Sequence, residues 1–294
     1  MKRILNAELS KFTTFGMGGI SRNLFIPETR DELIKLVTDG KEYRFIGGGS
    51  NLLINDKSEF DNVICLRAFS QQLSENETNE IRCSSGVRLQ KLIRFINEKE
   101  YGGIEYLYSV PGLVGGAVYM NAGRGKQYNC SISDYIVSVE VLCLTATSLG
   151  DVGDIKTLTK EQCQFEYRKS IFQNNDFLIL SVKFSFPNVS KEESRKKIAE
   201  RLEFCKKTQD YAGGNFGSVF STASPFIMNI VRKLHIGKKD GVHFSAKAYN
   251  WLINEQKDEP KQGGFDDTLK LINKVMKLHR LFHKPCQSEV VIWK

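Results

Sequence analysis

Hydrophobic residues recur along this chain at the spacing of amphipathic helices in several segments. Between Val87 and Asn97, apolar side chains three or four positions apart fall on one helical face. The same spacing predicts a helix over Asp266–His283 and a shorter one over Pro225–Leu234. A further helix is predicted over Asp31–Thr38, where two acidic residues suit the positively polarised first turn.

Short runs of β-branched and aromatic residues between these segments predict strands. The runs are Glu42–Ile46, Val63–Leu66, Val137–Leu144, Phe177–Phe186, Asn250–Asn254 and Glu289–Trp293. The alternation of strands and helices breaks at Pro187. After it, Ser190 can cap a charged helix over Lys191–Lys207, with Glu193 as its capping-box partner.

A chain of 294 residues is long enough for two domains. We therefore predict one domain over residues 1–187 and a second over 191–294.

The composition, 41% hydrophobic and 26% charged, is that of an ordinary globular protein. Apolar runs such as Phe177–Leu180 are far shorter than the roughly 20 residues that span a membrane. The segment Met1–Glu8 lacks the apolar stretch of a secretory signal, and the seven cysteines form an odd set without a Cys-x-x-Cys pair. We therefore expect a cytoplasmic protein with reduced thiols, no disulfide framework and no membrane partner.

The 42 basic and 34 acidic residues give a net charge of +8. A nucleic-acid-binding protein is one explanation, but the basic residues do not form one long tract with interleaved aromatic residues. They form short clusters spread over the second half, such as Arg195–Lys197 and Lys238–Lys239. Positive charge also favours phosphorylated or carboxylated small molecules. We expect such ligands, and no nucleic-acid partner.

Two glycine-rich loops are the most informative feature of the sequence. They are Gly47–Leu53, with the sequence GGGSNLL, and Pro111–Gly123, with the sequence PGLVGGAVYMNAG. Glycine adopts positive φ readily and lacks a Cβ, so such loops can bring backbone N–H groups close to phosphate oxygens. Neither loop matches a P-loop or a Gly-x-Gly-x-x-Gly motif between strand and helix. Together they favour a dinucleotide pyrophosphate held outside a Rossmann fold, rather than two tight turns in a glycine-rich sheet.

Three further residues are candidates for anion binding or proton transfer. Arg168 can present a guanidinium fork to a carboxylate, although a structural ion pair is the commoner role for a lone arginine. Ser218 lies outside any Gly-x-Ser-x-Gly motif, and its hydroxyl can instead donate a proton to a carbanion. Glu289 interrupts an apolar strand, where burial would raise its pKa or require a partner. The alternative for Glu289 is a water-facing side chain on an edge strand.

The four histidines show no metal-binding pattern. His279 and His283 share a helical face, but the segment between them lacks the glutamate of a zinc-protease motif. His235 and His243 have no acidic ligand pattern nearby. We expect surface or helix-end histidines and no catalytic metal.

These segments resemble, in the same order, those of the UDP-N-acetylenolpyruvoylglucosamine reductase (UDP-N-acetylmuramate dehydrogenase) family. The matching segments are Thr13–Gly19, Gly47–Leu53, Pro111–Gly123, Tyr167–Ser170, Gly217–Phe220 and Glu289–Val290. The glycine loops are shared more widely, with FAD domains of the vanillyl-alcohol-oxidase type. The extension Met120–Gly123 and the series Arg168, Ser218 and Glu289 are more specific to the reductases.

The resemblance implies an α+β fold with a two-lobed FAD-binding domain of the vanillyl-alcohol-oxidase (PCMH) type. The lobes would span residues 1–67 and 68–187. A smaller C-terminal α/β substrate domain would follow, with its last strand returning to the first lobe. FAD would bind non-covalently, with its pyrophosphate against both glycine loops, at Gly47, Gly48, Gly49, Ser50, Asn51, Leu52, Pro111, Gly112, Gly115, Gly116 and Ala117.

The implied activity is an oxidoreductase step of peptidoglycan precursor synthesis, and so of cell-wall biogenesis, cell shape and cell division. NADPH would reduce FAD and leave, and the UDP-sugar substrate would then bind. Its enolpyruvyl ether would be reduced, which converts it to UDP-N-acetylmuramate. In the family pattern Arg168 and Glu289 stabilise the aci-carboxylate, with Glu289 protonated, and Ser218 delivers the final proton.

The second half departs from the family pattern. Lys-Asn-Pro after the serine motif is replaced by Ser221–Ala223, a histidine by Ala248, and Gln-Pro by Gln209–Asp210. The gap between Arg168 and Ser218 lacks the inserted tyrosine loop of longer members, so the chain resembles the shorter type. Two alternatives stay open: a relative that reduces another enolpyruvyl nucleotide sugar for surface polysaccharide, and an inactive FAD-binding homologue.

Overall fold

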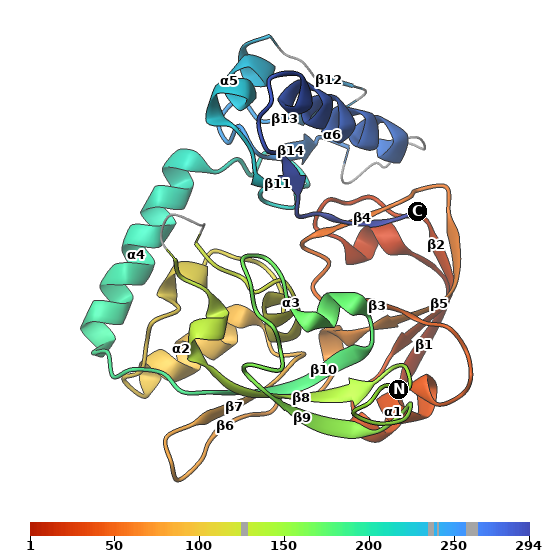
Figure 1. Cartoon of the computed structure of the whole chain (residues 1–294), viewed down its shortest axis with the longest axis vertical. Helices are drawn as coiled ribbons and strands as arrows, with labels where there is room; N and C mark the ends of the chain where they lie inside the picture. The colour runs from red at the N-terminus through yellow and green to blue at the C-terminus, as the bar shows by residue number, and fades with distance from the viewer. Residues whose placement is uncertain (125–128, 235–237, 240, 257–263) are drawn as a thin grey trace. The chain divides into compact units, whose positions relative to one another are not determined.

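The structure is a computed structural model that describes residues 1–124, 129–234, 238–239, 241–256 and 264–294 (Figure 1). Its helices and strands form an α+β fold, as the sequence predicts. The chain divides into two compact units. The first contains Met1–Arg3, Leu24–Gly48 and Asn62–Phe204; the second contains Ile4–Asn23, Gly49–Asp61 and Cys205–Lys294. The predicted boundary at residues 187–191 thus lies inside the first unit.

A buried carboxylate holds the start of α4 (Lys191–Thr208) within the first unit. Glu105 is 2% exposed, and its Oε1 accepts a hydrogen bond from the buried Ser194 hydroxyl of α4 at 2.8 Å. Asn97 of α2 (Leu89–Glu98) donates to the same hydroxyl at 3.1 Å. Buried polar groups are stable when they are hydrogen-bonded. This network therefore attaches α4 to segments that precede it, and the compact unit extends beyond Pro187.

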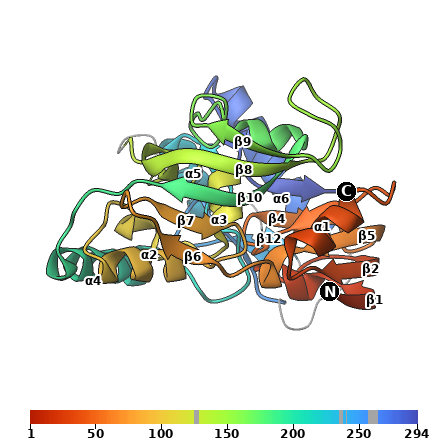
Figure 2. The ribbon, with the colours of Figure 1, turned by 90° about the horizontal axis from the view of Figure 1, so that it is seen from below.

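A five-stranded antiparallel sheet forms the centre of the first unit. Figure 2 shows its order, β6-β7-β10-β8-β9. The strands are β6 (Leu73–Glu75), β7 (Ile81–Ser84), β8 (Ile136–Cys143), β9 (Ile155–Thr159) and β10 (Phe177–Phe184). Because β10 is the central strand, nearly all of its side chains are buried. The apolar face of α2 and the short helix α3 (Val114–Tyr119) share one hydrophobic core with this sheet.

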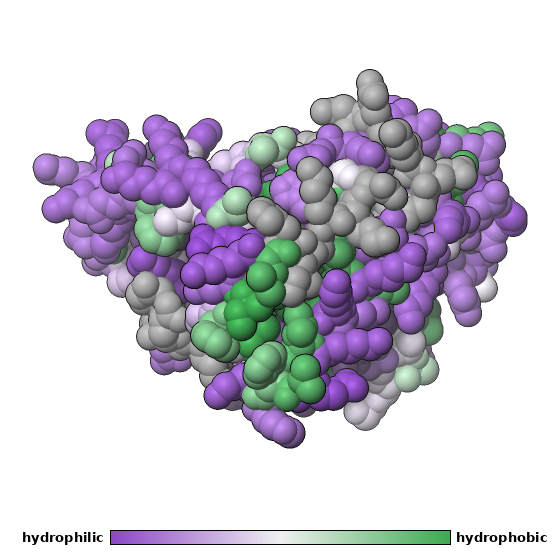
Figure 3. All heavy atoms as spheres, turned by 90° about the horizontal axis from the view of Figure 1, so that it is seen from above, coloured by the Kyte–Doolittle hydropathy of each residue, from purple (hydrophilic) through white to green (hydrophobic). Residues whose placement is uncertain are grey.

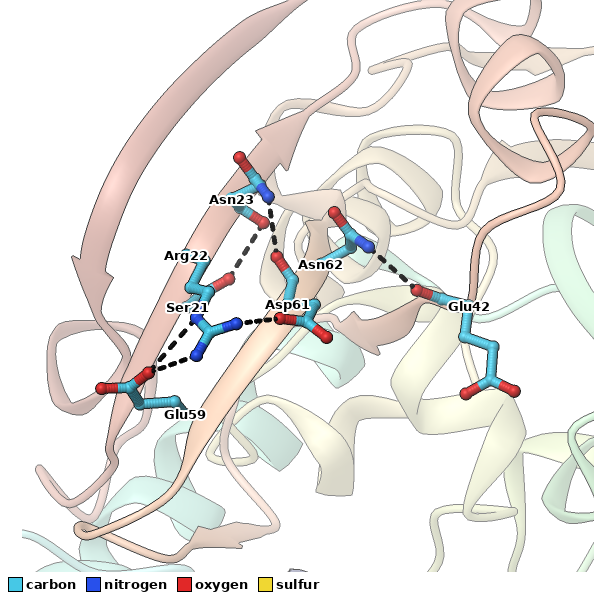
Figure 4. Close-up of polar contacts among 7 residues, drawn as sticks. All are labelled: Ser21, Arg22, Asn23, Glu42, Glu59, Asp61 and Asn62. Carbon is cyan, nitrogen blue, oxygen red and sulfur yellow. Dashed lines mark hydrogen bonds and ion pairs between the residues drawn. The ribbon is translucent and has the colours of Figure 1, made fainter.

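A second sheet, of order β1-β2-β5-β3, is formed by β1 (Lys2–Glu8), β2 (Ile20–Ile26), β5 (Glu59–Cys65) and β3 (Arg44–Ile46). Arg22 on β2 forms ion pairs with Glu59 at 2.9 Å and with Asp61 at 2.8 Å, both on β5 (Figure 4). All three side chains are more than half exposed. Exposed pairs contribute little to stability, so we expect these to favour the strand register instead. Helix α1 (Arg30–Val37) follows β2 and begins with a capping box.

The second unit combines α5 (Pro225–Lys233) and α6 (Gly264–Leu281) with short strands. These are β11 (Phe220–Thr222) with β15 (Gln287–Ser288), and a sheet of β12 (Lys238–Lys239), β13 (Val242–Phe244) and β14 (Leu252–Asn254). A parallel pair joins β4 (Leu52–Ile54) to β16 (Val291–Trp293). The last strand thus lies beside a segment that the sequence assigns to the first lobe.

His279 lies in the last turn of α6, as the prediction of a surface or helix-end histidine allows, but it is buried and not on the surface. It is 0% exposed. Its Nε2 accepts a hydrogen bond from the Ser224 amide at 2.9 Å, so Nδ1 carries the proton and donates it to the Val275 carbonyl at 2.9 Å. His283 does lie exposed beyond the end of α6, and His235 lies outside the described residues.

Exposed apolar side chains gather on α5 and at the end of α6. Phe226 and Leu234 are each 66% exposed, and Leu281 is 71% exposed. Figure 3 shows a band of hydrophobic residues on the face that it displays. Among the described residues, no helix combines the length and the hydropathy needed to cross a membrane.

A partly buried ion-pair cluster in the first unit predicts sensitivity to acid. Glu140 on β8 accepts hydrogen bonds from Arg30 at 3.0 Å, from Arg82 at 3.0 Å and from the Ser181 hydroxyl at 2.8 Å. Burial alone would raise the pKa of Glu140, but these donors outweigh burial and lower it below its usual value. A carboxyl whose pKa is lower in the folded state stabilises the protein above its unfolded pKa, and this contribution disappears as the pH falls.

We predict that Glu140→Gln lowers the free energy of unfolding by about 1–3 kcal/mol at neutral pH, because it leaves two guanidinium groups without a carboxylate. Urea unfolding at pH 7 and near pH 4 measures this, and the gap between variant and wild type should shrink on acidification. Glu59→Gln, at an exposed ion pair, should change stability little at either pH. An equal gap at both pH values would contradict the interpretation.

Candidate functional site

The two glycine loops meet backbone to backbone in the first unit. A Cβ on Gly48 would lie 2.7 Å from Gly112 Cα, closer than real Cβ contacts allow. Gly112 has φ +135°, which non-glycine residues rarely adopt. Arg67 donates a hydrogen bond to the Gly48 carbonyl at 3.1 Å. Glycine is therefore required at both positions for the loops to approach this closely.

The second loop is tied to the segment that precedes α2. The Gly112 carbonyl accepts a hydrogen bond from Leu89 N at 3.1 Å, and Gly115 N donates to the Ser85 carbonyl at 2.9 Å. A Cβ on Gly115 would lie 2.8 Å from Ser85 Cβ. From Val114 to Tyr119 the chain forms α3, where the sequence predicts a loop. The cause is this anchoring: propensity alone disfavours a helix with adjacent glycines, and packing overrides it.

Two of the glycines face open space. A Cβ on Gly116 would meet nothing within 4 Å, and one on Gly47 would meet only Leu113 Cδ1 at 3.9 Å. Gly116 is exposed and Gly47 half-buried. The loops thus offer uncovered main chain beside the tight contact of Gly48 with Gly112. This arrangement fits a diphosphate that approaches the backbone, as the sequence predicts.

The remainder of the first loop belongs to the second unit. Gly49 has φ +69°, and its carbonyl accepts a hydrogen bond from Thr14 N at 3.0 Å. The next residue but one, Asn51, donates its side-chain amide to the Glu289 carbonyl at 2.7 Å. Leu52 is buried in β4. Asn51 therefore holds the peptide of Glu289, which lies between β15 and β16, whatever it also does for a ligand.

Arg168 lies on a turn held by the Met120–Gly123 segment of the second loop. Its Nη2 donates to the Gly123 carbonyl at 2.8 Å and its Nη1 to the Asn121 carbonyl at 3.4 Å. Asn121 is 3% exposed and donates its side-chain amide to the Glu166 carbonyl at 2.8 Å. Both Arg168 and Asn121 have positive φ, at +59° and +41°. Strained backbone of this kind marks a position that its surroundings fix.

Burial raises the pKa of several tyrosines in the first unit, among them Tyr106 and Tyr119. Arg168 is close enough to Tyr106 to oppose this rise in part. Both phenols therefore stay protonated at neutral pH, and Arg168 contributes a positive charge near Tyr106.

Ser218 and Glu289 lie together in the second unit. The Glu289 amide donates to the carbonyl of Val219, the residue after Ser218, at 3.0 Å. Both Ser218 and Glu289 are half-buried. The Ser218 hydroxyl makes no hydrogen bond to any residue that the structure describes. This leaves a hydroxyl available to a ligand, within a segment that the strand pair β11–β15 keeps next to Glu289.

The structure thus brings Gly47 and Gly48 together with Pro111–Ala117, and Ser218 together with Glu289. Arg168 and the second loop both belong to the first unit. Sequence reasoning missed two supporting amides, Asn121 and Asn250. Asn250 holds β11 by accepting from Phe220 N at 3.1 Å and donating to the Phe220 carbonyl at 2.8 Å. In the sequence, only the position of Asn121 within Met120–Gly123, the segment more specific to the reductases, could have indicated such a role.

Comparison with known proteins gives matches over the whole chain. Residues 22–148 match a family described as an FAD binding domain. UDP-N-acetylenolpyruvoylglucosamine reductase of Prochlorococcus marinus (strain NATL2A) is 32% identical over 279 residues, which cover 92% of this chain and 91% of that protein. The protein of the same name from Thermotoga maritima is 28% identical, with 97% of each chain covered.

Among solved structures, UDP-N-acetylenolpyruvylglucosamine reductase from Thermus caldophilus matches with a TM-score of 0.77 and 25% identity. The match covers 100% of this chain and 98% of that chain. The similarity therefore includes the segments of both compact units.

We predict that Gly116→Ala weakens FAD binding by about ten-fold or more without destabilising the apoprotein. The new methyl group would enter the open space proposed for the diphosphate, while alanine favours a helix by up to about 1 kcal/mol over glycine. Titration of apoprotein with FAD, followed by flavin fluorescence, measures the first effect, and thermal unfolding of the apoprotein measures the second.

Gly115→Ala is the matched control, one residue away in the same helix. Its methyl group would meet Ser85 Cβ at 2.8 Å, so this variant should lower the stability of the apoprotein itself. Wild-type affinity for FAD in Gly116→Ala would place the diphosphate elsewhere.

Proposed function

Because this chain belongs to the UDP-N-acetylenolpyruvoylglucosamine reductase family, we propose that it reduces the enolpyruvyl ether of UDP-N-acetylglucosamine to UDP-N-acetylmuramate, with NADPH as hydride donor. The predicted oxidoreductase class and FAD cofactor are confirmed at the level of the family, as is the fold with its PCMH-type FAD-binding domain. The finer proposal depends on one observation: the same chain contains two glycine loops in close contact and a segment in which Ser218 lies near Glu289.

Residues of both glycine loops would hold the cofactor. The proposed residues of the first loop are Gly47, Gly48, Gly49, Ser50, Asn51 and Leu52, and those of the second loop are Pro111, Gly112, Gly115, Gly116 and Ala117. When bound, FAD supplies the hydride chemistry, taking hydride from NADPH and passing it to the enolpyruvyl group. We propose non-covalent binding, because the 187 residues that the sequence assigns to the FAD domain contain no histidine that could link a flavin.

Arg168 would stabilise the negative charge that develops on the substrate carboxylate. Addition of hydride to the methylene carbon leaves the neighbouring carbon as an enolate conjugated with the carboxylate. A fixed donor at such a charge contributes on the order of 3–4 kcal/mol to the transition state. The carbonyls of Asn121 and Gly123 already fix two nitrogens of the guanidinium, so little reorganisation is required of it.

Glu289 and Ser218 would supply the remaining groups that the reaction needs. A protonated Glu289 donates a hydrogen bond to the aci-carboxylate. The Ser218 hydroxyl then gives its proton to the carbon that carries the ether oxygen, and recovers a proton from solvent. A serine hydroxyl is a weak acid, so this transfer needs a strongly basic carbanion, which the enolate supplies.

One observation favours the second candidate, a relative that reduces another enolpyruvyl nucleotide sugar. Asp210 stands where the family has a proline, and it accepts a hydrogen bond from the Ser245 hydroxyl at 2.6 Å. The same hydroxyl accepts from the amide of Ala248, the residue in place of the family's histidine, at 2.9 Å. The two altered segments are therefore joined through the Ser245 hydroxyl. The change of the family's histidine to Ala248 removes an imidazole that could recognise the ligand.

We also propose the cytoplasm as the compartment. All seven cysteines are free thiols, and five of them are buried. Free thiols in this number suit a reducing environment.

Anaerobic mixing of the FAD-loaded protein tests the proposed function. NADPH should bleach the flavin absorbance, and UDP-N-acetylglucosamine enolpyruvate should restore it. We predict that Ser218→Ala slows the second step about 100-fold or more and leaves the first step intact, because only the second step needs the proton. Glu289→Gln should slow the second step as well, through loss of the carboxyl.

Ser221→Ala, a serine on the adjacent strand β11, is the matched control and should leave both steps unchanged. Bleaching by NADPH without recovery on this substrate, but with recovery on another enolpyruvyl nucleotide sugar, would select the second candidate. No bleaching by NADPH would contradict both.

A further inference from the structure

A tryptophan lies directly opposite Ser218 in the second unit. Ser218 and Trp251 form an antiparallel bridge, and Val219 N donates to the Asn250 carbonyl at 2.8 Å beside it. In such a pair both side chains lie on the same face, with Cβ atoms about 4.5–5.5 Å apart. The indole therefore lies next to the hydroxyl that the proposed mechanism uses as proton donor.

Trp251 is not part of the hydrophobic core. The next residue, Leu252, is 0% exposed and belongs to the core cluster of the second unit, whereas Trp251 is half-buried and lies outside that cluster. Side chains alternate along a strand, so Leu252 points inward and Trp251 outward. A half-exposed tryptophan that the core does not use is a candidate for ligand contact.

Tyr211 fixes the orientation of the indole. The two rings meet edge to face, with centroids 5.9 Å apart and an interplanar angle of 86°. Tyr211 is itself 62% exposed. Edge-to-face pairs are favourable arrangements of aromatic rings, and they hold a ring in place without covering both of its faces. The result is an aromatic surface beside Ser218.

The proposed reaction indicates which part of the substrate would contact this aromatic surface. The carbon that Ser218 protonates carries the ether oxygen, and that oxygen is bonded directly to the sugar ring. A proton donor must be within about 3 Å of the carbon it protonates. The pyranose ring, only two bonds further on, is then within reach of a side chain that neighbours the donor. The C–H groups of a pyranose present an apolar face that suits an aromatic ring.

We propose that Trp251, oriented by Tyr211, binds the amino-sugar ring of the nucleotide-sugar substrate and so contributes to its recognition. The inference rests on the proposed function, because it takes Ser218 as the proton donor. It adds a substrate-binding residue in the part of the chain where the family's recognition motifs are altered.

Steady-state kinetics with UDP-N-acetylglucosamine enolpyruvate tests the inference. Trp251→Ala should raise the KM for this substrate about ten-fold, with kcat at saturation and the rate of flavin bleaching by NADPH nearly unchanged. Trp251→Phe keeps an aromatic face and should restore most of the lost affinity. Tyr211→Ala should raise the KM less, since it only loosens the indole. Phe226→Ala, at a residue of α5 that is 66% exposed, is the control and should change neither constant.

Fluorescence gives a second readout that does not depend on the folding of Trp251→Ala. The chain has two tryptophans, so Trp251 is the only one left in Trp293→Phe. Addition of UDP-N-acetylmuramate, the product, to the FAD-loaded variant should change its tryptophan emission in a saturable way. Trp293 packs against Phe60 with ring centroids 5.6 Å apart, a contact that phenylalanine can preserve.

The possible results distinguish a failure of this inference from a failure of the proposed function. Suppose that the substrate restores the flavin absorbance of the wild-type protein. A wild-type KM in Trp251→Ala, or an unchanged tryptophan emission of Trp293→Phe on addition of the product, would then overturn the inference and leave the proposed function standing. Equal losses in the NADPH step and the substrate step of Trp251→Ala would show a structural role and also overturn it. Failure of the wild-type protein to restore its flavin absorbance with this substrate would reject the proposed function itself.

Discussion

The contact of two glycine backbones, at Gly48 and Gly112, is the constraint on which the site in the first unit depends. Any Cβ at Gly48 would overlap the main chain of the other loop. The open main chain of Gly47 and that of Gly116 lie in these same two loops, and we propose that they bind the cofactor together. The same loop continues through α3 to Asn121 and Gly123, whose carbonyls hold Arg168. One close approach thus places both the proposed cofactor cradle and the proposed carboxylate-binding guanidinium.

Main-chain carbonyls and side-chain amides hold the functional residues in position. Arg168 is held by two carbonyls, and the Glu289 peptide by Val219 on one side and Asn51 on the other. The ion-pair cluster of Glu140 lies instead on β8 of the central sheet, where it serves stability.

Sequence periodicity predicted the long elements well. The four helices α1, α2, α5 and α6 begin and end within two residues of their predicted positions, because each buries one continuous apolar face. The charged helix α4 was predicted from its cap, and Ser190 does accept a hydrogen bond from Glu193 N at 3.2 Å. Short strands such as β6 and β11, three residues each, have too few positions to show a period.

Features set by tertiary contacts escaped prediction for a physical reason. α3 forms at adjacent glycines because its start is anchored to Ser85 and Val87, which the local sequence does not reveal. His279 is buried because Ser224 and Val275 satisfy both of its nitrogens. The pairing of β16 with β4, in contrast, is what the resemblance implied for the last strand, and it accounts for the interleaving of N-terminal segments with the second unit. The candidate glycines and catalytic side chains could be proposed from the sequence because their chemistry, unlike these contacts, is local, and their roles stay predictions.

The dissociation constant of FAD from Gly48→Ala tests the central claim most directly. A methyl group at this position must push the loops apart, so the account predicts at least about ten-fold weaker FAD binding by a protein that keeps the circular dichroism of the wild type. Wild-type affinity in a folded Gly48→Ala protein would contradict the claim that the approach of these two backbones forms the cofactor site.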